Sequence, residues 1–255
     1  MDLDPGDVFA DILIDALAGR GGMGVVYAGT HQLLQRRVAL KLIAPALSED
    51  AAAAIREALY GNASNARHRA DSAIQQSNGR DVQYPVALAL ARIGDSPRAR
   101  ELTADLERRF PEDTSVRFGY LPVLRAQLAL NDGDPSAALR ALEPAARFDL
   151  AAHGVAYNGF FGAMYTVFLR GEAYLAAGQP AEALREFERI IGHRGIVLAD
   201  PVDAFARLQR ARALVALGRT ADARRAYEDL LALWRNADAG LPLLERVKAE
   251  YAASR

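Results

Sequence analysis

Residues 170–191 read RGEAYLAAGQPAEALREFERII, and residues 210–231 read RARALVALGRTADARRAYEDLL. The two stretches align without a gap, so that Gly178 matches Gly218. In each stretch an apolar helical pattern ends at the glycine, and a second helical pattern begins just after it. Each stretch therefore predicts a helical hairpin, and the repetition predicts a stack of hairpins.

Three earlier stretches carry the same pattern of an apolar helix, a glycine turn, and an alanine five residues after the glycine. The glycine suits a left-handed helix cap, and the small alanine lets the two helices approach closely. One hairpin cannot bury its apolar face alone, so neighbouring hairpins must stack. The predicted turn glycines are Gly61, Gly94, Gly133, Gly178 and Gly218, and the predicted contact alanines are Ala66, Ala99, Ala138, Ala183 and Ala223.

After the last hairpin, apolar residues recur at spacings of three and four, at Leu241, Leu244, Val247 and Tyr251. This spacing places them on one face of a helix. A terminal helix with a single apolar face is what a stack of hairpins needs to cover its last exposed surface. We therefore expect a capping helix at the C-terminal end.

The repeated pattern covers residues 50–235 and resembles the tetratricopeptide repeat, whose period is about 34 residues. The turn glycines are separated by 33, 39, 45 and 40 residues, so longer helices or loops are expected within the array. A helical-hairpin array of another type is the alternative. The resemblance implies a protein or peptide partner that binds in a groove lined by the first helix of each pair.

The composition is that of a globular chain, with 51% hydrophobic and 25% charged residues, a net charge of -1 and no cysteine. The near-zero charge gives no reason to expect nucleic acid as a partner. The longest strongly apolar stretch, 160–169, is too short to span a membrane, and no two of the four histidines have metal-ligand spacing. The acidic start, MDLDPGD, does not resemble a secretory signal, so we expect a cytoplasmic protein with no membrane partner and no metal.

Residues 1–47 differ from the rest because they combine clustered glycines with alternating β-branched residues. This pattern predicts a short, three-stranded antiparallel β segment. Residues 48–255 are rich in alanine, leucine and arginine, and they predict an α-solenoid of about five hairpins with its capping helix. The predicted fold is therefore mainly α, with a separate β segment at its start.

The β segment contains a glycine-rich pattern, GRGGMGVVY at 19–27, followed by VALK at 38–41. Only two of the 31 basic residues are lysines, so a lysine at position 41 is notable. The pairing resembles the start of the N-terminal lobe of a bacterial serine/threonine protein kinase. A dinucleotide-binding loop fits poorly, because a strand pattern and not a helix follows Gly24. The kinase resemblance implies ATP-binding roles for Gly19, Gly21, Gly24, Val26, Ala39 and Lys41.

The motifs that a kinase needs for phosphoryl transfer are missing from the sequence, which contains no HRD catalytic loop, no DFG and no APE. Glu57 could match the kinase glutamate that pairs with the lysine, or it could be a surface residue of the first repeat. The whole chain resembles kinases with C-terminal tetratricopeptide repeats, known chiefly from acidobacteria, with most of the kinase domain missing. We therefore predict an interaction module without catalytic residues and without a required cofactor. The alternative is a kinase by family that retains weak ATP binding, so enzymatic activity is left undecided.

Two sets of residues in the repeats have both a structural and a functional interpretation. Four aromatic residues fall on one helical face, where they could form core or could anchor a partner in a groove. Five arginines could recognise acidic segments or could pair with acidic residues one helical turn away. The aromatic set is Tyr157, Phe161, Tyr165 and Phe168, and the arginine set is Arg207, Arg210, Arg212, Arg224 and Arg225.

Overall fold

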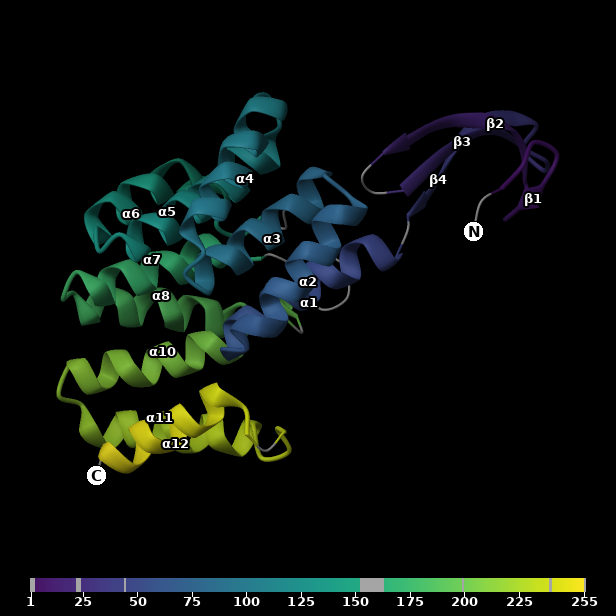
Figure 1. Ribbon diagram of the computed structural model, residues 1–255. Helices are drawn as coiled ribbons and strands as arrows, with labels where there is room; N and C mark the ends of the chain where they lie inside the picture. The colour runs from purple at the N-terminus through teal and green to yellow at the C-terminus, as the bar shows by residue number, and fades with distance from the viewer. Residues whose placement is uncertain are drawn as a thin grey trace.

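The fold was analysed in a computed structural model, which describes residues 3–21, 24–43, 45–151, 163–198, 200–238 and 240–254. The chain forms an antiparallel sheet followed by a long array of helices (Figure 1). This confirms the predicted fold class, which is mainly helical with antiparallel strands at the start.

The sheet contains one more strand than the sequence predicts. Its order is β1-β2-β3-β4, with every neighbouring pair antiparallel. The additional strand, β1, is only two residues long and pairs Val8 with Leu13. The strands are β1 (Val8–Phe9), β2 (Ile12–Gly21), β3 (Gly24–His31) and β4 (Arg36–Ile43).

The sheet is arched and projects from the helical array beside the start of the first helix (Figure 1). Ile14 and Tyr27 are buried within it, and the Tyr27 hydroxyl accepts a hydrogen bond of 3.0 Å from the Leu3 N–H. Strands β2 and β3 approach closely at Gly29, where a Cβ atom would lie 2.5 Å from the Ile12 side chain. The sheet therefore has a small packed centre of its own.

Five hairpins follow the sheet, each with the glycine turn that the sequence predicts. The helix pairs are α1 (Pro45–Tyr60) with α2 (Ala63–Gln76), α3 (Arg80–Arg92) with α4 (Ser96–Arg109), α5 (Leu121–Asn131) with α6 (Pro135–Leu142), α7 (Tyr165–Ala176) with α8 (Pro180–Gly192), and α10 (Val202–Ala216) with α11 (Thr220–Leu233). A π-helical turn, Val116–Tyr120, precedes α5; a 3-10 helix, Glu143–Phe148, follows α6; and α9 (Arg194–Val197) is a single turn.

The turn glycines and contact alanines behave as predicted. All five glycines have positive φ, between +70° and +88°. Residues with a Cβ atom rarely adopt this backbone conformation. All five alanines have an exposed fraction of 0%. Asp134 caps the start of α6, because its side chain accepts a hydrogen bond of 2.8 Å from the Ala137 N–H.

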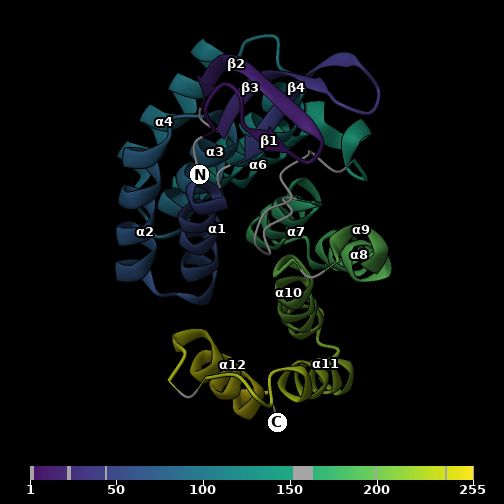
Figure 2. The same cartoon turned by 90° about the vertical axis from the view of Figure 1, so that its right-hand side faces the viewer.

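The interior of the array is filled more completely than the predicted open groove implies. Helix α3 is buried along its whole middle, from Asp81 to Ala91, because it packs against α1, α2, α4 and α5. Figure 2 shows the hairpins arranged in an arc, so that the first and last hairpins face each other. Within the described part of the chain, no helix has both the length and the apolar run that a membrane span requires.

The capping helix is α12 (Pro242–Ala253), which packs against α11. Leu244 and Val247 are buried as expected, and Leu243 is buried as well. Because two adjacent leucines are buried, α12 contacts more than one neighbouring surface. One of these surfaces belongs to the first hairpin, as described below.

Candidate functional site

The predicted nucleotide residues lie in register on three strands. Gly19 of β2 faces Val26 of β3, which in turn faces Lys41 of β4. Gly21 faces Gly24, so the two strands that carry the glycine-rich pattern pair antiparallel, as the sequence predicts. The strand register therefore brings the backbone of these residues into one part of the sheet.

Ala39, the remaining predicted nucleotide residue, faces Ala28 in the same register and is exposed.

Glu57 lies near the end of α1, where its carboxylate accepts a hydrogen bond of 2.8 Å from the Asn62 side chain. Glu57 thus has a local partner in its own hairpin, which agrees with its interpretation as a repeat residue.

Two of the four predicted partner-binding aromatics lie outside the described residues, namely Tyr157 and Phe161. The other two, Tyr165 and Phe168, are only 2% and 1% exposed. Phe168 packs with a ring-centroid distance of 6.0 Å to Phe187 on α8. Tyr165 and Phe168 therefore form part of the core, and in this structure they are not surface anchors.

A cluster of buried tyrosines joins the second, third and fourth hairpins. The rings of Tyr84 and Tyr120 stack with centroids 4.1 Å apart, and the Tyr120 hydroxyl donates to Asp81 over 2.8 Å. The Tyr165 hydroxyl donates to Asp200 over 3.1 Å. Burial, reinforced by these carboxylates, raises the pKa of all three tyrosines. The three phenols therefore stay protonated, and those of Tyr120 and Tyr165 act as hydrogen-bond donors.

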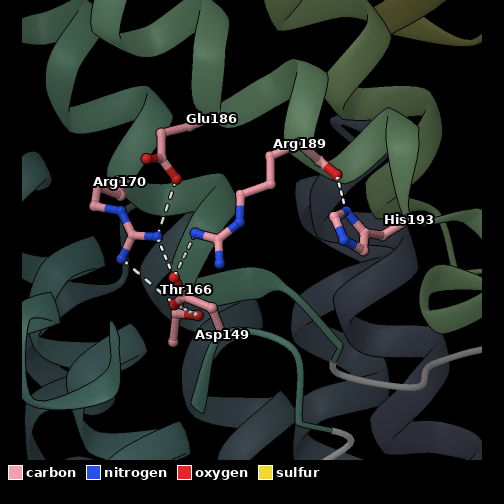
Figure 3. Close-up of polar contacts among 6 residues, drawn as sticks. All are labelled: Asp149, Thr166, Arg170, Glu186, Arg189 and His193. Atoms are coloured by element: carbon pink, nitrogen blue, oxygen red, sulfur yellow. Dashed lines mark hydrogen bonds and ion pairs between the residues drawn. The ribbon is translucent and has the colours of Figure 1, made fainter. Parts of the chain in front are cut away.

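Asp149, directly after the 3-10 helix, is the centre of a buried ionic cluster (Figure 3). Its carboxylate accepts from Arg170 over 2.6 Å and from Arg189 over 2.7 Å. The Thr166 hydroxyl donates to it over 3.1 Å, and Arg170 also donates to Glu186 over 2.9 Å. The cluster therefore ties the segment before α7 to both helices of the fourth hairpin.

The charges of this cluster are balanced, which suits a structural role. Burial alone would lower the pKa of Arg170, but the hydrogen bonds and charges of Glu186 and Asp149 raise it.

His193 caps α8 and places its Nδ1 atom 2.7 Å from the Arg189 carbonyl oxygen. Because a carbonyl oxygen only accepts hydrogen bonds, Nδ1 is the protonated nitrogen. Within the described residues, no group of three acidic or histidine side chains is arranged to hold a metal ion.

A second polar network runs from α3 through α7 and α10 to α12. Arg92 on α3 pairs with Glu172 on α7 over 2.9 Å, and Gln209 on α10 donates to Glu172 over 2.7 Å. Arg212 then donates twice to Glu250 on α12, over 2.9 and 2.7 Å. We call these five residues the inner strip. Each is only partly exposed, so the inner strip combines internal pairing with access to solvent.

The pairing of Arg212 with Glu250, at the end of the inner strip, shifts the pKa of both side chains. Burial alone would raise the pKa of Glu250, but the hydrogen bond and charge of Arg212 and a hydrogen bond of 3.0 Å from Tyr227 lower it. The same pairing raises the pKa of Arg212 against the effect of its own burial. The pair thus holds α12 onto the last hairpin.

The arginine set of the fifth hairpin follows the structural interpretation only in part, because two of its members pair with acidic residues one helical turn away and two pair with acidic residues of other helices. Four of the five pair with acidic residues, although sequence reasoning identified neither of the two pairs between different helices. For Arg225, no ion pair is formed with the residues that the structure describes. The pairs are Arg207 with Asp203, Arg210 with Glu188, Arg212 with Glu250, and Arg224 with Glu228.

The first and last hairpins meet at a seam, which sequence reasoning did not predict. The ring of Tyr60, the last residue of α1, lies 5.3 Å from the ring of Phe205 on α10 and 6.2 Å from that of Trp234. Gly61 lies against Pro242, the first residue of α12. A cavity of about 270 Å³ opens at this seam, between the end of α1, the end of α3 and α12.

Comparisons with known proteins agree with the repeat pattern. The family model described as "Tetratricopeptide repeat" matches residues 164–189 and 204–229, which are the hairpins α7–α8 and α10–α11. The crystal structure of a thermophilic tetratricopeptide-repeat protein of Thermus thermophilus is similar, with a TM-score of 0.56 and 15% identity. The similarity covers 82% of this chain and 98% of that chain. No curated protein matches the sequence.

These findings establish that tetratricopeptide repeats are present and that the array has the corresponding fold. The family match lies within the fourth and fifth hairpins, and it does not bear on the kinase resemblance of residues 12–43. That resemblance, and the nucleotide-binding roles that it implies, stay predictions.

Proposed function

We propose that this chain, which carries tetratricopeptide repeats in its fourth and fifth hairpins, is a protein interaction module that binds a segment of a partner protein on the inner strip. One observation carries the proposal. The inner strip crosses α7 and α10, the first helices of the two hairpins that match the repeat family. Stacked hairpins present extended surfaces that suit peptide recognition.

The first helices differ in how much surface they offer. Helix α3 is buried along its middle, and α5 has Arg125 as the exposed residue among 121–128. In the second half of α7, from Arg170 onward, and along α10, by contrast, partly exposed polar side chains are interspersed with buried residues. A partner segment would therefore find hydrogen-bonding side chains at α7 and α10, with Gln209 near the middle of the inner strip.

A peptide-display selection against the purified chain tests this proposal. Selected peptides are titrated against the native chain and against Gln209→Ala, a change that removes the central amide of the inner strip. We expect at least a fivefold weaker affinity for this variant. Arg185→Ala is the control, because Arg185 is exposed on α8 and pairs with Glu182. Peptides that bind both variants as tightly as the native chain would contradict the proposed surface.

A second candidate function belongs to the sheet. We further propose that residues 12–43 derive from a serine/threonine kinase lobe, bind ATP only weakly and transfer no phosphoryl group. The register of Gly19, Val26 and Lys41 supports a shared origin with nucleotide-binding loops. Equilibrium binding of labelled ATP with magnesium, beside Lys41→Ala, tests this. Saturable binding well below about 1 mM that is lost in Lys41→Ala would contradict the weak-binding proposal. The cytoplasm stays the predicted compartment.

A further inference from the structure

We propose that the cavity at the seam is a binding site for a small organic carboxylate with an apolar chain, and that such a ligand holds the first hairpin against α12. This site is separate from the inner strip that we propose for a protein partner. The cavity has a volume of about 270 Å³, which is the size range of a small metabolite. It is lined by Ala58, Leu59, Tyr60, Gly61, Ala63, Arg92, Ile93, Leu243 and Arg246.

The charged part of the lining favours an anion. The cavity wall contains two arginines, from α3 and α12, and no acidic residue. Arg246 is exposed, and although its charge also acts on Glu250 one turn further along α12, it forms no close ion pair with the described residues. Its guanidinium can therefore donate hydrogen bonds to a ligand. A guanidinium presents parallel donors that match the two oxygens of a carboxylate.

Arg92 supplies a second and more unusual donor. Its terminal nitrogens bind Glu172, at 3.2 and 2.9 Å. Its Nε–H is buried and has no hydrogen-bond partner among the described residues. A buried donor without a partner is costly, and a carboxylate oxygen in the cavity could accept from it. Because Glu172 already neutralises most of the Arg92 charge, one carboxylate is enough to balance the cavity.

The remainder of the lining favours an apolar chain over a compact inorganic anion. Leu59 of α1, Ile93 directly after α3, and Leu243 of α12 contribute branched apolar side chains. With a phosphate ion bound, these apolar side chains would stay exposed to water, whereas a bound aliphatic chain would cover them. The ligand class that uses both parts of the cavity is therefore an aliphatic carboxylate.

The position of the cavity gives binding a mechanical consequence. Its lining residues come from the first two hairpins and from α12, which otherwise meet through a few side chains around Tyr60. A ligand that bridges Arg92 and Arg246 would stabilise the closed seam, because anything that binds only the closed form shifts the equilibrium toward it. The chain contains a single tryptophan, Trp234, which lies at the seam and reports on it.

The experiment titrates the full chain with sodium hexanoate and follows Trp234 fluorescence, with backbone amide NMR signals of Gly61 and Leu243 as a second readout. We expect saturable changes with a dissociation constant on the order of 1 mM, as suits a ligand of this size. Hexanamide, a neutral compound of nearly the same shape, should bind at least tenfold more weakly. Sodium phosphate should also bind at least tenfold more weakly.

Arg246→Gln should weaken hexanoate binding at least tenfold, because it removes the charge while keeping a polar side chain. The matched control is Arg225→Gln, since Arg225 is exposed on α11, away from the cavity, and should leave the affinity within twofold of the native value. Equal affinity for hexanoate and hexanamide would overturn the anion site. No saturable change with hexanoate, or equal losses in the two arginine variants, would also overturn it.

Discussion

The ring of Tyr60 at the end of α1 lies 5.3 Å from the ring of Phe205 on α10, with the two planes tilted by 56°. This contact joins the first hairpin to the fifth and turns the open arc of a repeat array into a nearly closed one (Figure 2). Aromatic pairs at this separation and tilt are attractive beyond their burial. Closure of the array thus depends on a few side chains, which single substitutions can test.

Tyr60→Ala should open the seam. The change removes the contacts with both Phe205 and Trp234, and we expect a loss of about 1–3 kcal/mol in the free energy of unfolding. Urea unfolding followed by Trp234 fluorescence measures it. Tyr60→Phe keeps the ring and should cost less than about 1 kcal/mol. Equal losses in the two variants would show that the ring contacts do not hold the seam.

Gly171→Ala should destabilise the fourth hairpin. A Cβ atom at this position would lie 2.5 Å from the Phe187 ring, which is fully buried and cannot move freely. We expect a loss of about 1–3 kcal/mol by overpacking, measured by thermal or urea unfolding. Gly192→Ala is the control, because nothing lies within 4 Å of its added Cβ. A fully tolerated Gly171→Ala would mean that α7 and α8 pack less closely than described.

Asp149→Ala should leave two arginines without their shared partner. Arg170 and Arg189 both donate to this buried carboxylate, so we expect a loss of about 2–4 kcal/mol in the free energy of unfolding. Glu245→Ala removes an exposed ion pair with Lys248 and should change stability by less than about 0.5 kcal/mol. Unfolding of both variants at the same urea concentration would show that Asp149 does not stabilise the fold through its two arginines.

Glu250 should make the stability of the array sensitive to acid. Its pKa in the folded chain is lowered by Arg212 and Tyr227, so its contribution is complete above the ordinary glutamate pKa of about 4.3 and is lost as the pH falls through the lower folded value. Urea unfolding of the native chain and Glu250→Gln at pH 6 and pH 3 measures this. The difference between the two chains should be larger at pH 6. An equal difference at both pH values would contradict the predicted linkage.

Local features of the fold were accessible from the sequence, whereas contacts between distant repeats were not. The roles of the five turn glycines and the five contact alanines could be predicted, because helix capping and close helix approach depend on residues that are near in sequence. The Tyr60–Phe205 contact depends on the curvature accumulated over all the hairpins. No local pattern in the sequence encodes that curvature.

In the candidate sites, too, local features could be predicted from the sequence and contacts between distant residues could not. The aromatic pattern at Tyr165 and Phe168 identified apolar residues, but only the packing of the array decides that both are core. Asp149 was missed because its partners, Arg170 and Arg189, lie on two later helices with no fixed spacing from it. A signal was present in Arg170, a charged residue within the apolar face of α7, which a search for partners could have used.

Photo-crosslinking tests the proposed interaction surface most directly. A benzophenone amino acid is placed at position 216, an exposed alanine two helical turns after Gln209 on the same face of α10, or at position 185 on the exposed side of α8. Each chain is irradiated with a display-selected peptide. We predict efficient crosslinking from position 216 and little from position 185. Crosslinking that is equal at the two positions, or stronger at position 185, would contradict binding on the inner strip.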